Sequence, residues 1–361
     1  MIGQSRSLGA GIGCGRPHRP PSSRRKTGSA LGSRRLEPIM PDRYAVFGNP
    51  VYHSLSPQIH LLFAQQEKSD LTYERILAPL DGFEAAVEEF RANGGKGCNV
   101  TVPFKVEAYA LGASLSRDAY ASGAVNTLKF GDKGDRSDWV ADNTDGRGFL
   151  LDLKRLGFKI KGKKVLVCGS GGAARGLLPP LCSGKAKRVA VAARTLGRLD
   201  DMRSVLGFDE FDFETLREFK EGDFDLIVNA TSASLAGESL PIRKRLYQGC
   251  ELAYDLAYGP EPTRFQIDAA ENGAKRAEDG LGMLVCQAAL SYEIWRGFRP
   301  NLKPVLQQLR NLKSKKGRKV DMDGKAEKGG KGEKGEKGEK GEKDSKRAKQ
   351  DKSGKSPKSN R

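Results

Sequence analysis

Short apolar runs alternate with amphipathic stretches through the first part of this sequence. The pattern predicts, in chain order, a strand at Tyr44–Gly48, a helix from Pro57 to about Gln66, a strand at Tyr73–Leu77, a helix near Gly82–Ala92 and a strand at Cys98–Val102. Alternation of this kind is typical of α/β proteins, in which the helices pack on a sheet. We therefore expect an α/β domain in this part of the chain.

A second alternating pattern follows a helix that begins near Asp145 and a Lys- and Gly-rich hinge at residues 159–164. Its apolar runs predict strands at Lys164–Cys168, Arg188–Ala192, Phe224–Val228 and Leu252–Tyr254, with helical stretches between them. Strands joined in this way predict a doubly wound sheet. A long helix at Gly282–Trp295 and a short one around Pro304–Leu309 end the regular pattern.

The periodicity and the length of 361 residues predict two domains flanked by two polar ends. We expect an α/β domain at residues 40–145, completed by helices at 282–312, and a doubly wound domain at 146–281, with a cleft between them. Residues 1–39 lack hydrophobic periodicity and residues 313–361 are of low complexity. Both ends are therefore predicted to be disordered.

The formal net charge of +18 is concentrated in these two ends. Residues 1–39 contain eight Lys and Arg against one acid, residues 313–361 contain nineteen against nine, and residues 40–312 keep about +1. A nearly neutral body needs no folded basic groove, so we do not expect it to bind nucleic acid. Weak electrostatic attachment of the C-terminal tail to RNA, DNA or a membrane face is an alternative.

The two ends also differ in composition. Residues 1–39 are rich in Arg and Ser and poor in acids, as in an organelle transit peptide; an extended reading frame upstream of a start at Met40 explains this equally well, and we favour it. The tail contains consecutive Gly-Glu-Lys triplets from Gly332 to Lys343, which have the glycine period of collagen but no proline. This composition favours disorder over a collagen helix.

The number and spacing of cysteine and histidine and the hydropathy of the chain indicate further what class of protein this is. The sequence has three histidines and six cysteines, and no C-x-x-C or zinc-ligand spacing occurs among the cysteines Cys14, Cys98, Cys168, Cys182, Cys250 and Cys286. We expect buried free thiols, a reducing cytoplasm and no metal site. No apolar run approaches the roughly 18–20 residues of a membrane-spanning helix, so a soluble protein with no membrane partner is predicted.

A glycine-rich segment, Gly169-Ser170-Gly171-Gly172-Ala173, lies between an apolar run and a helical pattern. A turn of this kind places backbone N–H groups and the positive end of a helix dipole beside a pyrophosphate. Gly169 and Gly171 would keep side chains away from the phosphates, and Gly172 and Ala173 would allow the helix to pack closely on the strand. The segment predicts a dinucleotide site.

The next predicted strand ends in Ala192-Ala193-Arg194-Thr195-Leu-Gly-Arg198, where a dinucleotide-binding unit contacts the adenosine ribose. An acid here would select NAD, but the sequence offers Arg194 and Arg198. Guanidinium groups bind phosphate in a bidentate manner, so the pattern indicates a clamp for the 2′-phosphate of NADP. The alternative is that both arginines are ordinary exposed cations at a helix start.

Polar residues follow the predicted strands of the first domain. Ser54 and Ser56 stand in a loop before a helix, where two hydroxyls can bind a carboxylate; Ser56 can also cap the helix begun at Pro57. Further polar residues group around a helix expected to start at Pro103, or near the domain boundary: Asn99, Thr101, Lys105, Asn126, Asp145 and Gln287. This set of amide, ammonium and carboxylate groups suits a polyhydroxylated ring.

Several blocks in this order resemble the shikimate dehydrogenase family, and the resemblance extends from about Tyr44 to Leu312. The matching blocks are Phe47-Gly-Asn-Pro50, His53-Ser-Leu-Ser-Pro57, Asn99-Val-Thr-Val-Pro-Phe-Lys105, Gly123-Ala-Val-Asn-Thr127, Asp142-Asn-Thr-Asp-Gly146, Gly169-Ser-Gly-Gly172, Asn229-Ala-Thr-Ser232 and Asp279-Gly-Leu-Gly-Met283. The resemblance implies an N-terminal α/β substrate domain and a C-terminal Rossmann-type, doubly wound NADP-binding domain.

The resemblance also implies an activity, the reversible NADPH-dependent reduction of 3-dehydroshikimate to shikimate in chorismate and aromatic amino-acid biosynthesis. Ser54 and Ser56 would hold the substrate carboxylate, and Lys105 and Asp145 would be the catalytic pair. The ring hydroxyls would contact Lys105 and Asp145 themselves together with Asn99, Thr101, Asn126, Gln287 and Tyr258. An ammonium beside the reacting oxygen would supply the proton and stabilise developing charge.

The cofactor residues implied by the resemblance are Gly169, Ser170, Gly171, Gly172, Ala173, Ala193, Arg194, Thr195, Arg198, Ala230, Thr231, Leu256, Gly280 and Met283. The chain departs from the family pattern at two of the positions near this site. Ala193 stands where the family usually has Asn, and Ser234 occupies a position that is often Gly. A contact on the adenine side and the loop near the nicotinamide are therefore expected to differ.

Two other functions compete with this interpretation. A catabolic quinate/shikimate dehydrogenase would accept quinate and often prefer NAD, but Arg194 and Arg198 argue against it. A catalytically silent dinucleotide-binding or RNA-associated protein would not need the Lys105 and Asp145 pair. A homodimer is compatible with the sequence, which does not determine the oligomeric state.

Overall fold

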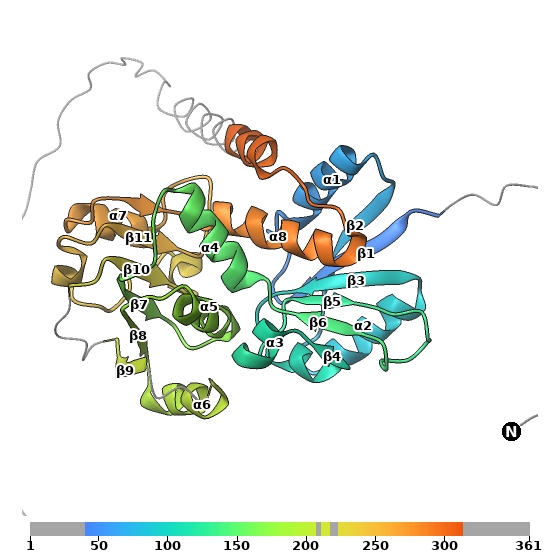
Figure 1. The fold of residues 1–361 in the computed structure, drawn as a ribbon, viewed down its shortest axis with the longest axis horizontal. Helices are drawn as coiled ribbons and strands as arrows, with labels where there is room; N and C mark the ends of the chain where they lie inside the picture. The colour runs from blue at the N-terminus through green and yellow to red at the C-terminus, as the bar shows by residue number, and fades with distance from the viewer. Residues whose placement is uncertain (1–39, 207–210, 217–222, 313–361) are drawn as a thin grey trace, which may run out of the picture. The chain divides into compact units, whose positions relative to one another are not determined.

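The computed structural model describes residues 40–206, 211–216 and 223–312, and its α/β architecture confirms the predicted fold class (Figure 1). Two six-stranded sheets lie within these residues. The expectations for residues 1–39, including Cys14, and for residues 313–361 lie outside the described residues.

The first sheet is mixed and has the strand order β2-β1-β3-β5-β6-β4. Strand β1 pairs in parallel with β2 and β3, whereas β5 is antiparallel to both β3 and β6. In chain order its elements are β1 (Asp42–Gly48), α1 (Ser56–Glu67), β2 (Leu71–Leu77), α2 (Phe83–Ala92), β3 (Gly95–Val100), the 3₁₀ helix η1 (Glu107–Leu111), β4 (Ser114–Leu115), α3 (Arg117–Ser122), β5 (Thr127–Lys129), β6 (Val140–Asp142) and α4 (Asp145–Arg155).

Strand β1 shows why this sheet is covered on both faces. Its buried residues alternate between two cores, because successive side chains of a strand point to opposite faces. Tyr44 and Val46 pack into the cluster that contains helix α1, and Ala45 and Phe47 pack into the cluster that contains helix α2. A continuous apolar run therefore becomes a strand buried between two helical layers.

The second sheet is parallel throughout and has the strand order β12-β11-β10-β7-β8-β9. The chain starts in the middle at β7, moves outward to β9, and then crosses to the other side, which confirms the predicted doubly wound topology. In chain order the elements are β7 (Lys164–Cys168), α5 (Gly172–Ser183), β8 (Arg188–Ala193), α6 (Leu196–Leu206), β9 (Phe211–Thr215), β10 (Leu226–Asn229), η2 (Ala233–Ala236), η3 (Lys244–Tyr247), β11 (Leu252–Asp255), α7 (Arg264–Glu271) and β12 (Ala277–Glu278).

Helix α8 (Leu281–Arg296) contacts the cores of both sheets, and Figure 1 shows it and α4 running between them. Met283 packs into the cluster around β7 and α5, and Val285 and Tyr292 pack into the cluster around β1 and α1. At its last turn Arg296 forms ion pairs with Asp42 and Glu67. Residues 302–312 form a further helix, as predicted.

The segment after β3 differs from the prediction. No α-helix starts at Pro103; residues 102–106 form a turn that leads into η1. The Lys105 carbonyl accepts a hydrogen bond from the Val125 N–H (2.7 Å), so it is bonded to the segment that precedes β5. Strand β3 likewise ends at Val100 rather than at Val102, and β10 begins at Leu226 rather than at Phe224.

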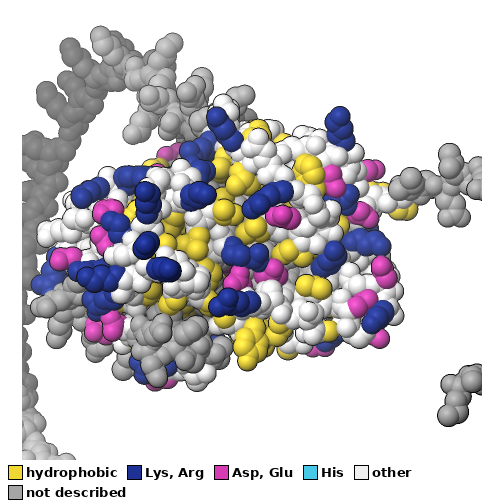
Figure 2. Space-filling model, in the orientation of Figure 1, with side chains coloured by type: hydrophobic (Ala, Val, Ile, Leu, Met, Phe, Trp, Pro, Cys, Tyr) yellow, Lys and Arg dark blue, Asp and Glu magenta, His cyan; other side chains and the backbone are white. Residues whose placement is uncertain are grey.

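Charged side chains of the face in Figure 2 are mixed, with Lys and Arg interspersed among Asp and Glu. Hydrophobic side chains gather near the middle of this face, and a groove between α4 and α8 is lined by Leu150, Leu151, Leu290 and Ile294.

Candidate active site

The centre of the site is an ion pair between two residues that are forty positions apart in the sequence. Lys105 Nζ donates to Asp145 Oδ2 at 2.5 Å, and Asp145 is only 3% exposed. Lys105 follows β3 and Asp145 follows β6, and both strands flank β5 in the sheet. Asp145 is the first residue of α4, where the helix dipole stabilises a carboxylate. The structure therefore brings together the two residues expected to be the catalytic pair.

Asn126 holds the carboxylate of this pair from the other side. Its amide Nδ2 donates to Asp145 Oδ1 (2.8 Å), to Thr144 Oγ1 (2.9 Å) and to Gln287 Oε1 (3.1 Å). Its amide oxygen accepts from the Thr144 backbone N–H (2.9 Å) and from Thr127 Oγ1 (2.8 Å). A side chain bonded this fully has one rotamer, so Asp145 is held in a defined orientation.

Asn99 extends the same network towards β2. Its Nδ2 donates to the Asn126 carbonyl (3.0 Å), Thr127 Oγ1 (3.2 Å) and Ser291 Oγ (3.0 Å), and its Oδ1 accepts from Tyr73 OH (2.7 Å). Burial raises the pKa of Tyr73 well above its usual value, so its hydroxyl remains a donor. Sequence reasoning missed Tyr73 and Ser291, because a tyrosine on a strand and a serine on a helix carry no motif.

The two serines expected to hold a carboxylate lie together. Ser54 Oγ donates to Ser56 Oγ (3.1 Å) and accepts from the Ser56 N–H (3.2 Å), and both residues are buried. Ser56 does not cap α1: the helix begins at Ser56 itself, and its N-cap residue Leu55 makes no side-chain cap bond. The capping alternative is therefore wrong: the Ser54 hydroxyl belongs to the loop that precedes the helix, and the Ser56 hydroxyl belongs to the first helical residue.

This serine loop is anchored by residues from both sheets. Arg75, on β2, donates from Nε (2.9 Å) and Nη2 (2.6 Å) to the Ser54 carbonyl. Tyr258, in the loop after β11, packs against the hydrophobic cluster around β1 and α1. Burial raises the pKa of Tyr258, and a hydrogen bond from the Leu55 backbone opposes that rise. Arg75 is a third residue that sequence reasoning missed.

Behind Asn99 lies a buried histidine. His60 is 1% exposed and stacks on Tyr73, with ring centroids 4.3 Å apart and an interplanar angle of 6°. Burial lowers the pKa of His60 to about 3, so the ring is neutral at physiological pH. His60 therefore forms part of the apolar floor under the polar network, and a charge at this position would be costly.

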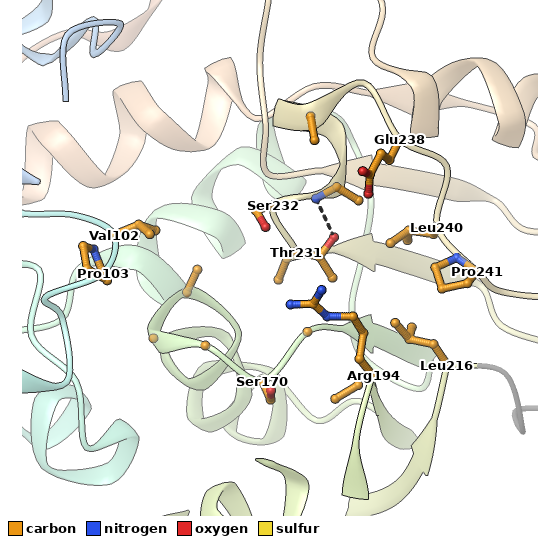
Figure 3. Close-up of a pocket in the computed structure, with 18 of the residues that line it drawn as sticks. Val102, Pro103, Ser170, Arg194, Leu216, Thr231, Ser232, Glu238, Leu240 and Pro241 are labelled. Atoms are coloured by element: carbon orange, nitrogen blue, oxygen red, sulfur yellow. Dashed lines mark hydrogen bonds between the residues drawn. The ribbon is translucent and has the colours of Figure 1, made fainter. Parts of the chain in front are cut away.

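A cavity of about 550 Å³ lies beside the lysine and carries most of the residues expected to hold the cofactor (Figure 3). Its lining includes the glycine turn from Gly169 to Ala173, the end of β8, and the loop after β10. Gly169 has a φ of +130°, which favours glycine, and a side chain at Gly171 would meet no atom within 4 Å. The turn thus presents open backbone at the N-terminus of α5, which suits a pyrophosphate.

The end of β8 supplies a cation to this cavity. Arg194 is exposed, lines the cavity, and its guanidinium points into it in Figure 3. Ala193 is buried in the core and also lines the cavity. The side chain of Arg198 lies outside the described residues, and Thr195 is exposed but does not line the cavity.

Three other residues expected at the cofactor are not on the wall of this cavity. Leu256, Gly280 and Met283 are not among its lining residues. A side chain at Gly280 would lie 2.1 Å from the Leu256 carbonyl oxygen, and the Met283 N–H donates to Tyr254 OH (3.2 Å). These contacts connect β11 to the start of α8.

The loop after β10 forms the opposite wall. Ala230 and Thr231 line the cavity as expected, together with Ser232 of the same sequence block. Residues that carried no motif also line it: Leu216, which follows β9, and Ala233, Ala236, Glu238, Ser239, Leu240 and Pro241. Ser234 anchors the loop from behind, because its Oγ donates to Asp255 Oδ2 (2.5 Å) and accepts from Asn229 Nδ2 (3.0 Å). Burial raises the pKa of Asp255, and its hydrogen bonds oppose that rise.

The segment after β3 also lines the cavity, with Val102, Pro103 and Lys105 (Figure 3 labels the first two). That Gly172 allows close packing of helix on strand stays a prediction, and the structure adds a second close neighbour for this residue. The three nearest atoms to a side chain built at Gly172 all belong to Lys105. The glycine turn and Lys105 are therefore direct neighbours.

Among the described residues, no helix is long and apolar enough to cross a membrane. Within the same residues no group of three or more His, Cys, Asp or Glu side chains is placed to hold a metal ion. The described cysteines are free thiols, and four of them are buried: Cys98, Cys168, Cys250 and Cys286, with Cys182 partly exposed.

The doubly wound sheet carries a cavity that suits a dinucleotide, and the Lys105–Asp145 ion pair lies beside that cavity. This combination defines a nucleotide-dependent oxidoreductase of the α/β class. Family models give the same answer in finer detail. The shikimate dehydrogenase substrate binding domain matches residues 46–128, shikimate / quinate 5-dehydrogenase matches 151–237, and the shikimate 5'-dehydrogenase C-terminal domain matches 280–310.

Relatives of known name cover nearly the same part of the chain. It is 50% identical over 273 residues to the shikimate dehydrogenase (NADP(+)) of Herminiimonas arsenicoxydans, which covers 75% of this chain and 98% of that protein. It is 49% identical over 275 residues to the enzyme of the same name from Janthinobacterium sp., with 75% and 97% covered. The chain belongs to the shikimate dehydrogenase family.

A solved structure agrees with this assignment. Shikimate 5-dehydrogenase from Thermus thermophilus, in complex with NADP(H) and shikimate, is 32% identical to this chain and superposes with a TM-score of 0.66. The match covers 75% of this chain and 99% of that one.

Proposed function

We propose that this chain is an NADP-dependent shikimate dehydrogenase, an oxidoreductase that acts on a CH–OH group and interconverts 3-dehydroshikimate and shikimate. The reaction belongs to chorismate and aromatic amino-acid biosynthesis. The observation that carries the proposal is the position of the Lys105–Asp145 pair directly against the glycine turn of the dinucleotide cavity. The named relatives, which match over almost their whole length, support the same reaction.

Lys105 and Asp145 form the proposed catalytic pair. The chemistry that bound NADPH supplies is the hydride that reduces the ring ketone. Lys105, or a water that it orients, donates a proton to the oxygen as it becomes an alkoxide, and its ammonium stabilises the charge that develops there. Asp145, fixed by Asn126, accepts a hydrogen bond from Lys105 and keeps the ammonium in place between proton transfers.

The substrate set extends from this pair to the serine loop. Ser54 and Ser56 are proposed to donate their hydroxyl hydrogens to the substrate carboxylate, with Arg75 holding the loop that carries them. The ring hydroxyls are assigned to Asn99, Thr101, Lys105, Asn126, Asp145, Tyr258 and Gln287. Because Asn99 and Asn126 are already fully bonded to protein groups, we expect them mainly to orient their neighbours.

The cavity residues fit NADP in two respects. The turn from Gly169 to Ala173 offers open backbone N–H groups at the start of α5, and Arg194 offers a guanidinium for the 2′-phosphate. We propose these residues with Ala193, Ala230 and Thr231 as the binding wall, and Arg198 and Thr195 as further contacts at the adenosine end. Leu256, Gly280 and Met283 are proposed to support that wall from behind.

The domain limits, the compartment and the oligomeric state complete the proposal. The substrate domain is assigned to residues 40–145 with 282–312, and the cofactor domain to 146–281. The core shared by α8 and β1 supports this division. The free thiols among the described residues support a reducing compartment, which we take to be the cytoplasm. A homodimer stays a prediction.

The decisive experiment is shikimate-dependent reduction of NADP by the purified chain, followed by the absorbance of the reduced nicotinamide. kcat/KM should be compared for shikimate and quinate, each with NADP and with NAD. The proposal predicts the highest kcat/KM for shikimate with NADP. A higher value for quinate with NAD would favour the catabolic alternative, and no turnover of either substrate would contradict the proposal.

A further inference from the structure

Gly172, at the start of α5 on the second sheet, lies against Lys105, which follows β3 of the first sheet. A Cβ atom built on Gly172 would lie 2.8 Å from Lys105 Cβ, 3.5 Å from its Cδ and 3.6 Å from its Cγ. Separations under 3.0 Å are essentially never seen for real Cβ atoms. The stem of the lysine therefore occupies the space that any side chain at residue 172 would need.

The lysine cannot move away easily, because its backbone is held on both sides. The Lys105 carbonyl accepts from the Val125 N–H at 2.7 Å. The preceding residue, Phe104, is buried and stacks on Phe83 with ring centroids 4.7 Å apart and an interplanar angle of 6°. The nearest atom, Lys105 Cβ, is attached directly to this fixed backbone, so rotation of the side chain would not relieve the contact.

The glycine turn is equally constrained. The Gly169 N–H donates to the Ala192 carbonyl at 2.7 Å, and the Arg175 N–H donates to the Gly171 carbonyl at 3.0 Å. One turn further along α5, a Cβ at Gly176 would lie 2.9 Å from the side-chain amide of Asn143. Helix α5 is thus packed tightly against the segment that leads to Asp145 as well as against Lys105, so its position is set by contacts at both its first and its second turn.

We infer that Gly172 is a positioning residue for the reaction: its missing side chain sets the separation between the proton-donating lysine and the turn that carries the cofactor. The inference rests on the proposed function for the role of Lys105, but the contact itself does not. A lysine displaced by even part of an ångström loses alignment with the reacting oxygen, and misplacement by about 1 Å can lower a rate about 100-fold.

The first test is Gly172→Ala, with Gly197→Ala as the matched control. Gly197 lies on α6, and a Cβ there would meet no atom within 4 Å. At saturating shikimate and NADP, we expect the kcat of Gly172→Ala to fall at least about 10-fold, while the Kd for NADPH, measured by fluorescence titration, changes less than about threefold. A kcat equal to that of Gly197→Ala, with a weakened Kd, would show that residue 172 serves cofactor binding alone and would overturn the inference.

The second test does not depend on turnover and applies even if Gly172→Ala is poorly folded. The melting temperature of Gly172→Ala should be lower than that of the wild type, and Lys105→Gly should abolish this difference because it removes all three contacting atoms. An equal decrease in the Lys105→Gly background would show that the new methyl group meets something else, and the inference would fail. Absence of shikimate oxidation by the wild type would contradict the proposed function instead, and the melting comparison would still decide the contact.

Discussion

The two halves of the site are built in opposite ways. On the substrate side, Asn99 and Asn126 hold Tyr73, Thr127 and Asp145 in a closed network of buried hydrogen bonds. On the cofactor side, the described wall includes open glycine backbone at Gly171 and the exposed side chain of Arg194. The difference follows from what each half has to do. A proton donor must be held rigidly before the reaction, whereas a pyrophosphate brings its own charge to N–H groups that need only be accessible.

The contrast predicts that mutations in the substrate network lower turnover, while mutations in the cofactor wall lower affinity. The largest effect is expected from Lys105→Ala. Loss of the general acid should lower kcat by about 10²–10⁴-fold, and the KM for shikimate should change little. Steady-state kinetics would measure both, and Lys96→Ala, an exposed lysine at the far end of β3, is the control. Near-normal turnover would remove Lys105 from the mechanism.

Arg194→Ala tests the cofactor side. A charge-assisted hydrogen bond to phosphate contributes roughly 1.5–3 kcal/mol, so the KM for NADP should rise about 10–100-fold while the KM for NAD stays close to that of the wild type. Lys187→Ala, which removes an exposed cation of the same lobe next to the start of β8, is the control for net charge. If the ratio of the two KM values does not change, the 2′-phosphate is bound elsewhere.

The buried floor of the substrate network should make folding sensitive to acid. The pKa of His60 is lowered to about 3 in the folded protein, against about 6.5 in the unfolded chain, so its contribution to stability is present above pH 6.5 and is lost as pH falls towards 3. Between pH 7 and pH 5 this loss should be about 2 kcal/mol.

Urea unfolding of the wild type and of His60→Phe at the two pH values measures this contribution. The variant keeps an aromatic ring against Tyr73 and removes the titrating group. The free energy of unfolding of the wild type should fall by about 2 kcal/mol more than that of the variant. Equal decreases would mean that His60 is not buried as a neutral ring.

The smallest effect is expected at Arg75, which supports the serine loop from its exposed side. Arg75→Met removes two hydrogen bonds to the Ser54 carbonyl, and a loss of about 1 kcal/mol would raise the KM for shikimate about fivefold with little change in kcat. Thr72→Ala, at an exposed position of the same strand, is the control. A lower kcat with an unchanged KM would place Arg75 in the chemistry rather than in substrate binding.

The chain pattern predicted much of the secondary structure because strands and helices bury their apolar residues with different periods. The continuous apolar run at Lys164–Cys168 could only be a buried strand, and the glycines after it predicted a turn with accessible backbone. The Pro103 segment was predicted wrongly. A proline suits a helix start, but the Lys105 carbonyl is bonded to Val125, a contact that no local pattern encodes.

The residue types by themselves determined which chemistry this protein can perform: a lysine, a carboxylate, paired serine hydroxyls, a glycine turn and an arginine at the end of a strand. Only the tertiary structure decided how these groups meet. Tyr73, Ser291 and Arg75 support the site from elements without any motif, and Gly172 faces Lys105, a residue 67 positions earlier in the chain. The physical reason is that hydrogen bonding and close packing depend on distances between atoms that the folded sheets bring together, whereas a sequence pattern reports only the local period of burial.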